Sequence, residues 1–439
     1  MSTTQQLSAT QQSPVTLALV GAGMRGLIYA RHALASGAGR IAAIAEPREE
    51  NRKAAAVEFG VPEDAVFDDW RALATALAAG QVEHIDAAVI ATQDRMHLEP
   101  AVAFAGLGCH LLLEKPMAPN EADSRRIVEA AEAADVILAV CHVMRYTPYT
   151  RTLKQVLDAG TIGDIISVQH LEPVGWWHQA HSFVRGNWRS ERESSPMLLA
   201  KSSHDVDWLI HIIGEQPARV CSFGSLTHFR EQNAPAGSTA NCLDCPVENT
   251  CPYSAKRIYL DCLGDPEKEF WPLSVVTSAR TEEGVLDALR GSQYGRCVYR
   301  CDNDVVDHQV VDLEFPSGAT ASFTMTAFTR LEHRKTRIFG TRGLIEGDGV
   351  RLWITDFLTD TDRIVDTGTD AGASAAEGHG GGDRELLDRF LEAVATGDRA
   401  KVLSDGPSSL ATHRAVWAAE RARTDGAVVV LDANPTPHL

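Results

Sequence analysis

The sequence predicts an α/β protein that opens with a Rossmann-type, doubly wound parallel sheet and continues into a second, larger domain. A glycine-rich turn follows the apolar run Val15–Val20. Apolar runs then alternate with helix-length segments as far as Arg145, which is typical of a parallel sheet covered by helices on both faces. The chain has 439 residues, too many for one ordinary domain.

Composition narrows the class of protein. The chain is 44% hydrophobic and 23% charged, and its formal net charge of -18 argues against a general binder of nucleic acid or anionic membranes. No apolar run approaches the roughly 20 residues of a membrane span. Residues 1–13 lack the features of a secretory signal, so we expect a disordered tail and a cytoplasmic protein. The nine cysteines are then free thiols or metal ligands.

The glycine-rich turn has the spacing G-x-G-x-x-G. Its first glycine makes the tight turn, its second lets the backbone approach a pyrophosphate, and its third lets helix and strand pack closely. The pattern alone also fits a turn in an unrelated α/β unit, but here a strand precedes it and another follows. We therefore expect the cofactor pyrophosphate at Gly21, Ala22, Gly23, Met24, Arg25 and Gly26.

The second strand ends in Glu46, 20 residues after Gly26. An acid at this place binds the ribose hydroxyls and repels a 2′-phosphate, which favours NAD over NADP. Arg48 lies close by in the sequence and keeps NADP open.

Two later strand ends carry polar side chains. The apolar run 83–92 ends in Thr92 with His97 shortly after it, and the run that begins at His110 ends in Glu114 and Lys115. Ligands bind beyond the carboxyl ends of parallel strands, so these four side chains are expected at the cofactor edge.

These motifs resemble the Gfo/Idh/MocA oxidoreductase family. The match rests on the glycine turn, on "ATQDRMH" and on Glu114-Lys115-Pro116, and continues through "SSHDVDWLIHIIG" and "IFGTRGLIEGD". The resemblance implies an NAD-binding Rossmann domain over residues 14–145. It also implies a substrate-binding and oligomerisation domain over 146–439, with a large, open, mostly antiparallel sheet. Two alternating runs around Pro-Ser-Gly within 310–328 support such a sheet independently, as a hairpin.

The resemblance also assigns catalytic roles. It places Lys115 near the nicotinamide and the reacting hydroxyl, and it makes His204 the group that takes the hydroxyl proton. An imidazole suits a base that works near neutral pH, and a cation at the oxygen stabilises developing alkoxide charge. Without the motif, His204 would be read as a packed or capping residue.

The chain departs from the family at one position. Many relatives have an aspartate four residues before the histidine, where this chain has Ala200 followed by Lys201. Lys201 either extends along its helix to water or joins Lys115, and Arg145 or Arg189, in a basic pocket. Such a pocket suits a sugar that carries carboxylate, sulfonate or phosphate, with Lys201 sharing the acid–base work.

An aromatic segment at 174–189 offers sugar-binding side chains, although a packed interface explains it equally well. His379 and Asp383 could reach the site, but the sequence does not orient them. The predicted substrate-binding residues are Arg145, Tyr146, Trp177, His178, Lys201 and His204.

A cysteine-rich insert is expected at about 225–300. The spacing C-x2-C-x5-C-x10-C is compatible with a zinc site or an iron–sulfur cluster, and ordinary reduced thiols are the alternative. Cys297 and Cys301 are rival ligands. The predicted ligands of a structural zinc are Cys242, Cys245, Cys251 and Cys262.

Together these features predict an NAD-dependent enzyme that transfers hydride at a ring hydroxyl of a sugar or polyol derivative. Two alternatives stay open: a redox-neutral, NAD-dependent glycosidase acting on an anionic glycoside, and a non-catalytic NAD-binding regulator. The expected partner is a small sugar or glycoside, with no nucleic acid and no membrane. The resemblance further implies a homo-oligomer formed through the open sheet.

Overall fold

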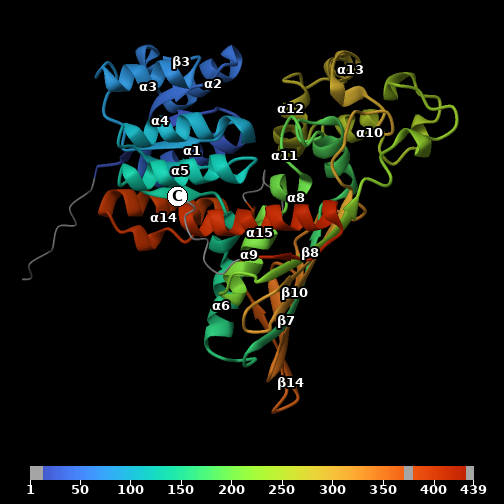
Figure 1. The fold of residues 1–439 in the computed structure, drawn as a ribbon. Coiled ribbons are helices and arrows are strands. Elements are labelled where there is room, and N and C mark those ends of the chain that lie inside the picture. Colours follow the sequence, from blue (N-terminus) through green and yellow to red (C-terminus); the bar gives the residue numbers. More distant parts are fainter. Residues whose placement is uncertain (1–12, 370–378, 432–439) are drawn as a thin grey trace, which may run out of the picture.

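The computed structural model describes residues 13–369 and 379–431. It has an N-terminal domain, a second domain built on a long sheet, and a lobe of short helices above that sheet (Figure 1). The predicted N-terminal tail lies, apart from Ser13, outside the described residues. Among the described helices, none is long and apolar enough to cross a membrane.

The N-terminal domain is a six-stranded parallel sheet with the strand order β3-β2-β1-β4-β5-β6. This order confirms the predicted doubly wound fold, and it reverses between β1 and β4, where such folds bind dinucleotides. The strands are β1 Val15–Val20, β2 Gly39–Ala45, β3 Val66–Phe67, β4 Ala87–Ile90, β5 His110–Leu113 and β6 Leu138–Val140. The helices of this domain are α1 Met24–Ser36, α2 Glu49–Phe59, α3 Trp70–Ala78, α4 Leu98–Gly106 and α5 Glu121–Ala133.

The glycine turn between β1 and α1 has the geometry that its sequence predicts. Gly21 has a φ of +98°, and a Cβ added there would lie 2.6 Å from the carbonyl oxygen of Ala91. A Cβ on Gly26 would lie 2.1 Å from the carbonyl oxygen of Gly21. Neither position can carry a side chain, because one needs a left-handed backbone and the other needs helix and strand in contact.

The second domain contains a nine-stranded sheet with the order β14-β13-β12-β11-β7-β10-β9-β8-β15. Its neighbouring strands are antiparallel except for the pair β7 and β10, so the predicted mostly antiparallel sheet is confirmed. The predicted hairpin is β9–β10. The strands are β7 Ile165–Pro173, β8 Arg219–Ser225, β9 His308–Glu314, β10 Thr320–Thr326, β11 Lys335–Gly340, β12 Gly343–Gly347, β13 Arg351–Asp356, β14 Thr361–Asp366 and β15 Val429–Val430.

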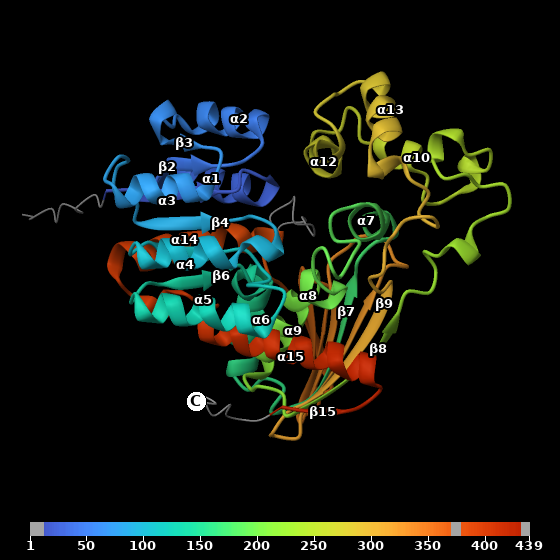
Figure 2. The ribbon, with the colours of Figure 1, turned by 45° about the horizontal axis from the view of Figure 1, so that its top comes forward.

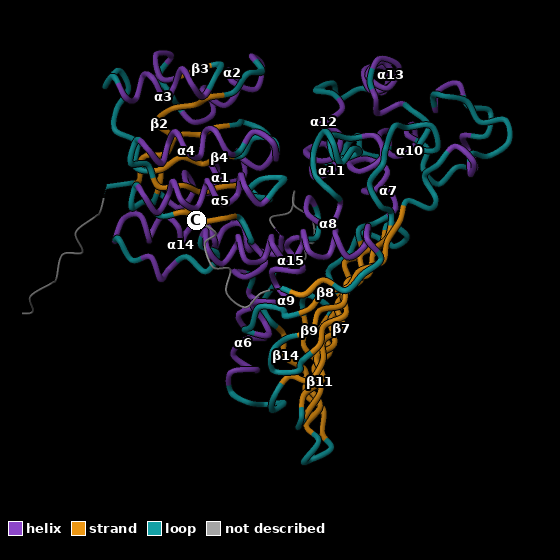
Figure 3. The backbone as a smooth tube through the Cα atoms, viewed as in Figure 1, coloured by secondary structure: helices purple, strands orange, loops and turns teal. Residues whose placement is uncertain are grey.

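Helices cover the face of this sheet that is turned toward the first domain (Figures 1 and 3). Side chains of alternate residues in β7, such as Val168 and His170, are buried beneath them. The long helix α15 contacts β8, α9 and α5, and therefore joins the two domains. These helices are α6 Pro148–Asp158, α8 Met197–Ala200, α9 Ser203–Ile213 and α15 Gly406–Asp425.

Helix α14, Gly382–Thr396, returns from the second domain to the first. Its apolar residues, among them Leu387 and Phe390, are part of the N-terminal core. We predicted a domain boundary at residue 145, with everything after it in the second domain. That boundary does not anticipate the position of α14, which comes late in the sequence but packs into the N-terminal core.

The insert forms a lobe with a hydrophobic core of its own (Figure 2). Its core includes Phe229, Tyr253 and Tyr259, together with Ala180 and Val184 from the segment after β7. The lobe's helices are α10 Ala255–Leu260, α11 Pro266–Lys268, α12 Ser274–Val276 and α13 Glu282–Gly291, and the segment after β7 forms α7 Trp176–His178 and the π-helical stretch Gln179–Arg185.

Candidate active site

The side chain of Lys115 links the two domains through its ammonium group. It follows directly after β5, and its Nζ donates a 2.6 Å hydrogen bond to the carbonyl oxygen of Ala200 at the end of α8. Burial lowers the pKa of Lys115 to about 8; Glu114 acts against this shift and Lys201 adds to it. Lys115 is therefore a cation that can exchange its proton near neutral pH.

The predicted cofactor residues Glu114 and Arg25 contact each other. Arg25 Nε donates to Glu114 Oε1 at 2.7 Å, and Tyr29 donates to the same oxygen at 2.9 Å. Burial alone would raise the pKa of Glu114, but Arg25 holds it below its usual value. This ion pair fixes the end of β5, and with it Lys115, against α1, while the cofactor contacts of Glu114 and Arg25 stay a prediction.

The glycine turn and Glu46, which are predicted to bind the nucleotide, contact each other. Glu46 is buried, and one of its oxygens accepts a 2.8 Å hydrogen bond from the Ala22 backbone N–H. Arg48 Nε donates to the other oxygen at 2.7 Å. Burial opposes ionisation, but these hydrogen bonds keep the pKa of Glu46 below its usual value. A Cβ on Gly23 would meet only Arg48, at 3.7 Å, so the outer face of the turn fits a close phosphate.

His97 does not face the predicted cofactor site with a free nitrogen. Its Nδ1 lies 2.8 Å from the carbonyl oxygen of Pro116, and its Nε2 lies 3.2 Å from that of Thr92. His97 therefore ties the loops after β4 and β5 together, and its contact with the cofactor stays a prediction. In the same loop Asp94, which the sequence reasoning missed, accepts a 2.8 Å hydrogen bond from Ser195 of the second domain.

His204 lies in the first turn of α9 and is almost fully buried. Its Nδ1 has no hydrogen-bond partner among the described residues. Burial, followed by the charge of Lys115, holds the pKa of His204 well below its usual value. At neutral pH the imidazole is therefore neutral, which is the form that can accept a proton.

The structure orients His379 and Asp383, which the sequence could not. The His379 ring centroid lies 5.5 Å from that of His204, and His379 Nδ1 lies 3.1 Å from Asp383 Oδ2. Arg25 Nη1 donates to the same carboxylate oxygen at 2.9 Å. A connected series of polar side chains thus runs from the glycine-turn helix α1 to the side of His204.

Lys201 has a buried carboxylate partner. Its Nζ lies 2.8 Å from Oε1 of Glu172, a residue of β7 that is 1% exposed. Arg334 Nε pairs with the other Glu172 oxygen at 2.6 Å and donates to Asp205 at 2.9 Å. Sequence reasoning missed Glu172 and Arg334. The available signal was an acid that alternates in β7 with Val168 and His170, on the buried side of the strand.

The basic pocket expected from the arginines does not form. Arg145 pairs with buried Asp207 through Nε and Nη2, at 2.7 and 2.6 Å. The Tyr146 hydroxyl accepts hydrogen bonds from backbone N–H groups of residues 403 and 404. Arg189 pairs with Asp302 at 3.1 Å. The polar groups of Arg145 and Tyr146 thus have partners within the protein, and their role as substrate contacts stays a prediction.

Trp177 and His178 lie where the insert meets the second domain. The ring centroids of Trp177 and His178 lie 5.1 and 4.8 Å from that of Trp271. Burial, followed by the charge of Lys201, holds the pKa of His178 well below its usual value. Both rings thus pack against Trp271 of the insert.

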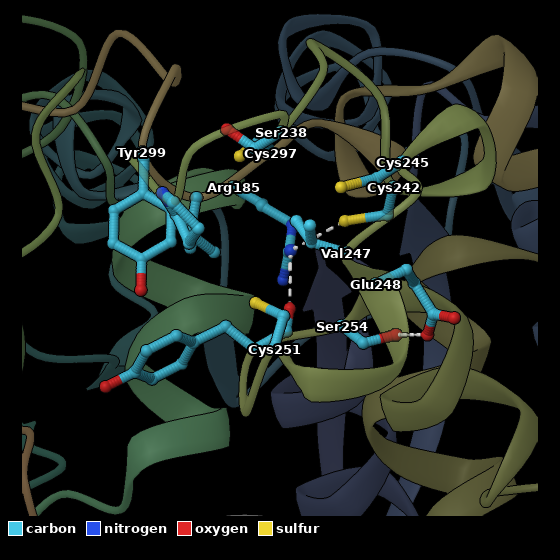
Figure 4. A pocket seen from close by; sticks show the side chains of 13 residues that line it. Arg185, Ser238, Cys242, Cys245, Val247, Glu248, Cys251, Ser254, Cys297 and Tyr299 are labelled. Atoms are coloured by element: carbon cyan, nitrogen blue, oxygen red, sulfur yellow. Dashed lines mark hydrogen bonds between the residues drawn. The ribbon is translucent and has the colours of Figure 1, made fainter. Parts of the chain in front are cut away.

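Three of the four cysteines predicted to bind zinc lie around one cavity, and the fourth does not. Cys242, Cys245 and Cys251 line one cavity together with Cys297 (Figure 4). Cys262 does not line it, and its thiol donates to the Ile258 carbonyl at 3.2 Å instead. In residues 13–369 and 379–431, no three His, Cys, Asp or Glu side chains are already arranged to hold a metal ion.

The fold and this site define the class of protein: a dinucleotide-binding domain joined to an open-sheet domain, with a lysine and a histidine where they meet. The family model for the oxidoreductase family with an NAD-binding Rossmann fold matches residues 15–142, and the model for its C-terminal alpha/beta domain matches residues 154–429. The chain therefore belongs to the Gfo/Idh/MocA oxidoreductase family, as the sequence motifs predict.

The sequence is similar to those of several oxidoreductases, at low identity. The chain is 25% identical to YteT of Bacillus subtilis over 275 residues, which is 61% of each chain. It is 27% identical to levoglucosan dehydrogenase of Pseudarthrobacter phenanthrenivorans over 39% of this chain and 42% of that one. The chain thus spans less than two thirds of the length of these relatives.

Solved structures share the fold over nearly the whole chain. An oxidoreductase from Agrobacterium radiobacter in complex with NAD+, L-tartaric acid and magnesium has a TM-score of 0.68 at 17% identity, covering 95% of this chain and 98% of that one. Levoglucosan dehydrogenase in complex with NADH and levoglucosan has a TM-score of 0.67 at 19% identity, covering 95% and 99%.

Proposed function

We propose that this protein is an NAD-dependent oxidoreductase that transfers hydride at a ring hydroxyl of a sugar or polyol derivative. The observation that carries the proposal is the meeting of Lys115, from the end of a Rossmann strand, with the helix pair that bears His204. The names of relatives support the substrate class, since they include levoglucosan dehydrogenase and myo-inositol 2-dehydrogenase.

Oxidation of an alcohol removes one hydride from carbon and one proton from oxygen. Bound NAD+ supplies the hydride acceptor. His204 is neutral, and its buried Nδ1 has no hydrogen-bond partner in the described part of the chain, so it takes the proton. The Lys115 ammonium stabilises the negative charge that develops on the substrate oxygen. An ammonium has three N–H donors and the Ala200 carbonyl accepts one of them, so Lys115 can also donate to the substrate.

The ion pairs bear on the charge of the substrate. Lys201 and Arg334 are balanced by Glu172 and Asp205, so the second domain offers little net positive charge at this place. This supports an uncharged ring over the anionic substrate that the sequence suggested, because a paired ammonium attracts a distant anion only weakly. Lys201 stays a candidate donor to a neutral hydroxyl.

A redox-neutral glycosidase is the second candidate. Ala200 replaces the aspartate that many relatives have, and the lowered pKa of Lys115 leaves a lysine able to give and take a proton. One relative, which is 29% identical over 33% of this chain, is named as a 2,7-anhydro-N-acetylneuraminate hydratase, so related sequences carry names other than dehydrogenase. No observation favours the non-catalytic regulator.

One assay separates the two enzymes. Purified protein with NAD+ is mixed with chromogenic glycosides and with the corresponding free sugars, neutral and anionic. Nicotinamide reduction and aglycone release are followed in the same sample. Net NADH formation with a free sugar supports the dehydrogenase. Aglycone release that requires NAD+ but gives no net NADH overturns it in favour of the glycosidase.

A further inference from the structure

The insert contains a group of thiols that hydride transfer does not use. Cys242, Cys245, Cys251 and Cys297 line a cavity of about 20 Å3 (Figure 4). Three of them come from one loop, and Cys297 comes from the segment that leads the chain back to the sheet. The two segments are joined at this place, because the Cys297 backbone N–H donates to the Ala240 carbonyl at 2.9 Å.

A buried cation borders the same cavity, and within residues 13–369 and 379–431 no carboxylate pairs with it. Arg185 is fully buried, and its Nε and Nη2 each donate a 2.8 Å hydrogen bond to a backbone carbonyl, of Arg296 and Tyr253. Nη2 also lies 3.5 Å from Cys242 Sγ, while Nη1 has no hydrogen-bond partner among the described residues. A buried guanidinium is costly unless negative charge lies beside it. The cavity therefore favours an anionic occupant.

We propose that Cys242, Cys245, Cys251 and Cys297 together bind one zinc ion. Four thiolates are a common tetrahedral ligand set for structural zinc. Binding releases four protons and leaves a complex of charge −2, which supplies the negative charge that Arg185 lacks. The cavity has room for about one water-sized sphere, which suits a single ion rather than a four-iron cluster.

The ion would organise the thiols as it binds. The four sulfurs already line one cavity, but they are not yet arranged around a common point. Our proposal requires the thiols to move toward a common point as the ion binds, and metal binding is commonly coupled to such ordering. The ion would close the base of the insert, because its ligands lie on both sides of helices α10 to α13, and the insert carries Trp271 against His178. The site would thus hold one wall of the active-site region in place.

Metal analysis and X-ray absorption test the proposal on the intact protein. Metal-free protein, reduced with a non-thiol reductant, is supplied with zinc alone and then desalted. We expect one zinc ion per chain. The X-ray absorption spectrum should show four sulfur atoms around the zinc, with Zn–S distances of about 2.3 Å. Cys242→Ser and Cys297→Ser should lose stoichiometric zinc. Cys262→Ser and Cys221→Ser, whose thiols lie outside the cavity, should keep it.

Three results would overturn the proposal. One is wild-type protein that retains no zinc. Another is zinc retained by Cys297→Ser but lost by Cys262→Ser, which would restore the ligand set suggested by spacing. The third is bound iron with inorganic sulfide. Circular dichroism of each variant shows whether it is folded. If a variant is not folded, the X-ray absorption spectrum of the zinc-loaded wild-type protein tests the ligand set instead. Two or more nitrogen or oxygen neighbours of zinc in that spectrum would contradict a four-cysteine site.

Discussion

The Lys115 ammonium donates to the carbonyl oxygen of Ala200 across 2.6 Å, and this one contact brings the end of a Rossmann strand onto the helices of the second domain. The acceptor is an uncharged backbone oxygen, so the contact adds no negative charge that would oppose the effect of burial. Burial accordingly lowers the pKa of Lys115 to about 8. The lysine can therefore exchange its proton near neutral pH.

Glu46 should set the choice of cofactor. Its carboxylate holds Arg48 and would repel a 2′-phosphate. Glu46→Ser removes the repulsion and releases Arg48 to bind that phosphate, so we expect the ratio of NADP to NAD affinity to rise at least about tenfold, an effect of about 1.4 kcal/mol. Calorimetric titration with each cofactor measures it. An unchanged ratio would show that the adenosine ribose lies elsewhere, and Glu49→Ser on the exposed side of α2 is the control.

Glu172 should matter more for stability than its partner Lys201. Glu172→Gln leaves Lys201 and Arg334 with less negative charge in a buried place, and breaking such a pair costs about 3–5 kcal/mol. Lys201→Met should cost less, because Glu172 keeps Arg334. Urea unfolding of the two single variants and the double variant gives the coupling energy. If Lys201→Met proved the more destabilising, the ion-pair geometry described above would be wrong.

Stability should fall as the pH drops below about 6.5. Burial lowers the pKa of His142 to about 3 and that of His413 to about 4, whereas both titrate near 6.5 in the unfolded chain. Between these values the unfolded state binds more protons, so stability is present above pH 6.5 and is lost as the pH falls. At pH 5 each histidine should cost about 2 kcal/mol.

Urea unfolding at pH 7 and pH 5 measures this loss. His142→Gln should shrink the difference between the two free energies of unfolding, whatever it does to either value alone. A difference that stays the same in the variant would mean that His142 is not buried as a neutral imidazole. His84, which is largely exposed, supplies the control substitution His84→Gln.

The open face of the nine-stranded sheet should pair with a second copy of the chain. Phe223 and Ile364 are 68% and 63% exposed on that face, and Ile364 lies opposite Trp353 across β13 and β14. Apolar side chains on a broad open sheet favour association. Ile364→Glu should shift the protein toward monomer in light scattering, whereas Val57→Glu on exposed α2 should not. A wild-type monomer at high concentration would contradict the expectation.

The sequence predicted the parts of the molecule that local patterns determine. The turn glycines need their special backbone, and Lys115 follows an apolar strand, so both could be placed from short motifs. The partners could not, because they are distant in the chain: Arg25 and Asp383 are 358 residues apart. The cysteines show the same limit. Cys262 follows the other three closely in sequence, yet its thiol donates a hydrogen bond to the Ile258 carbonyl four residues earlier. Cys297 follows α13 in the sequence and lines the cavity instead.

The claim that Lys115 and His204 perform the chemistry while other residues hold the cofactor is tested most directly by measuring binding and turnover together. NAD+ affinity and NADH formation are compared for wild type, Lys115→Met and His204→Asn. The substrate is the sugar that gives NADH in the assay with glycosides and free sugars. We expect NAD+ affinity to stay within a few-fold, and turnover to fall about 10²–10⁴-fold in both variants. Turnover that survives in either variant, or that falls only as far as NAD+ binding does, would contradict the assignment.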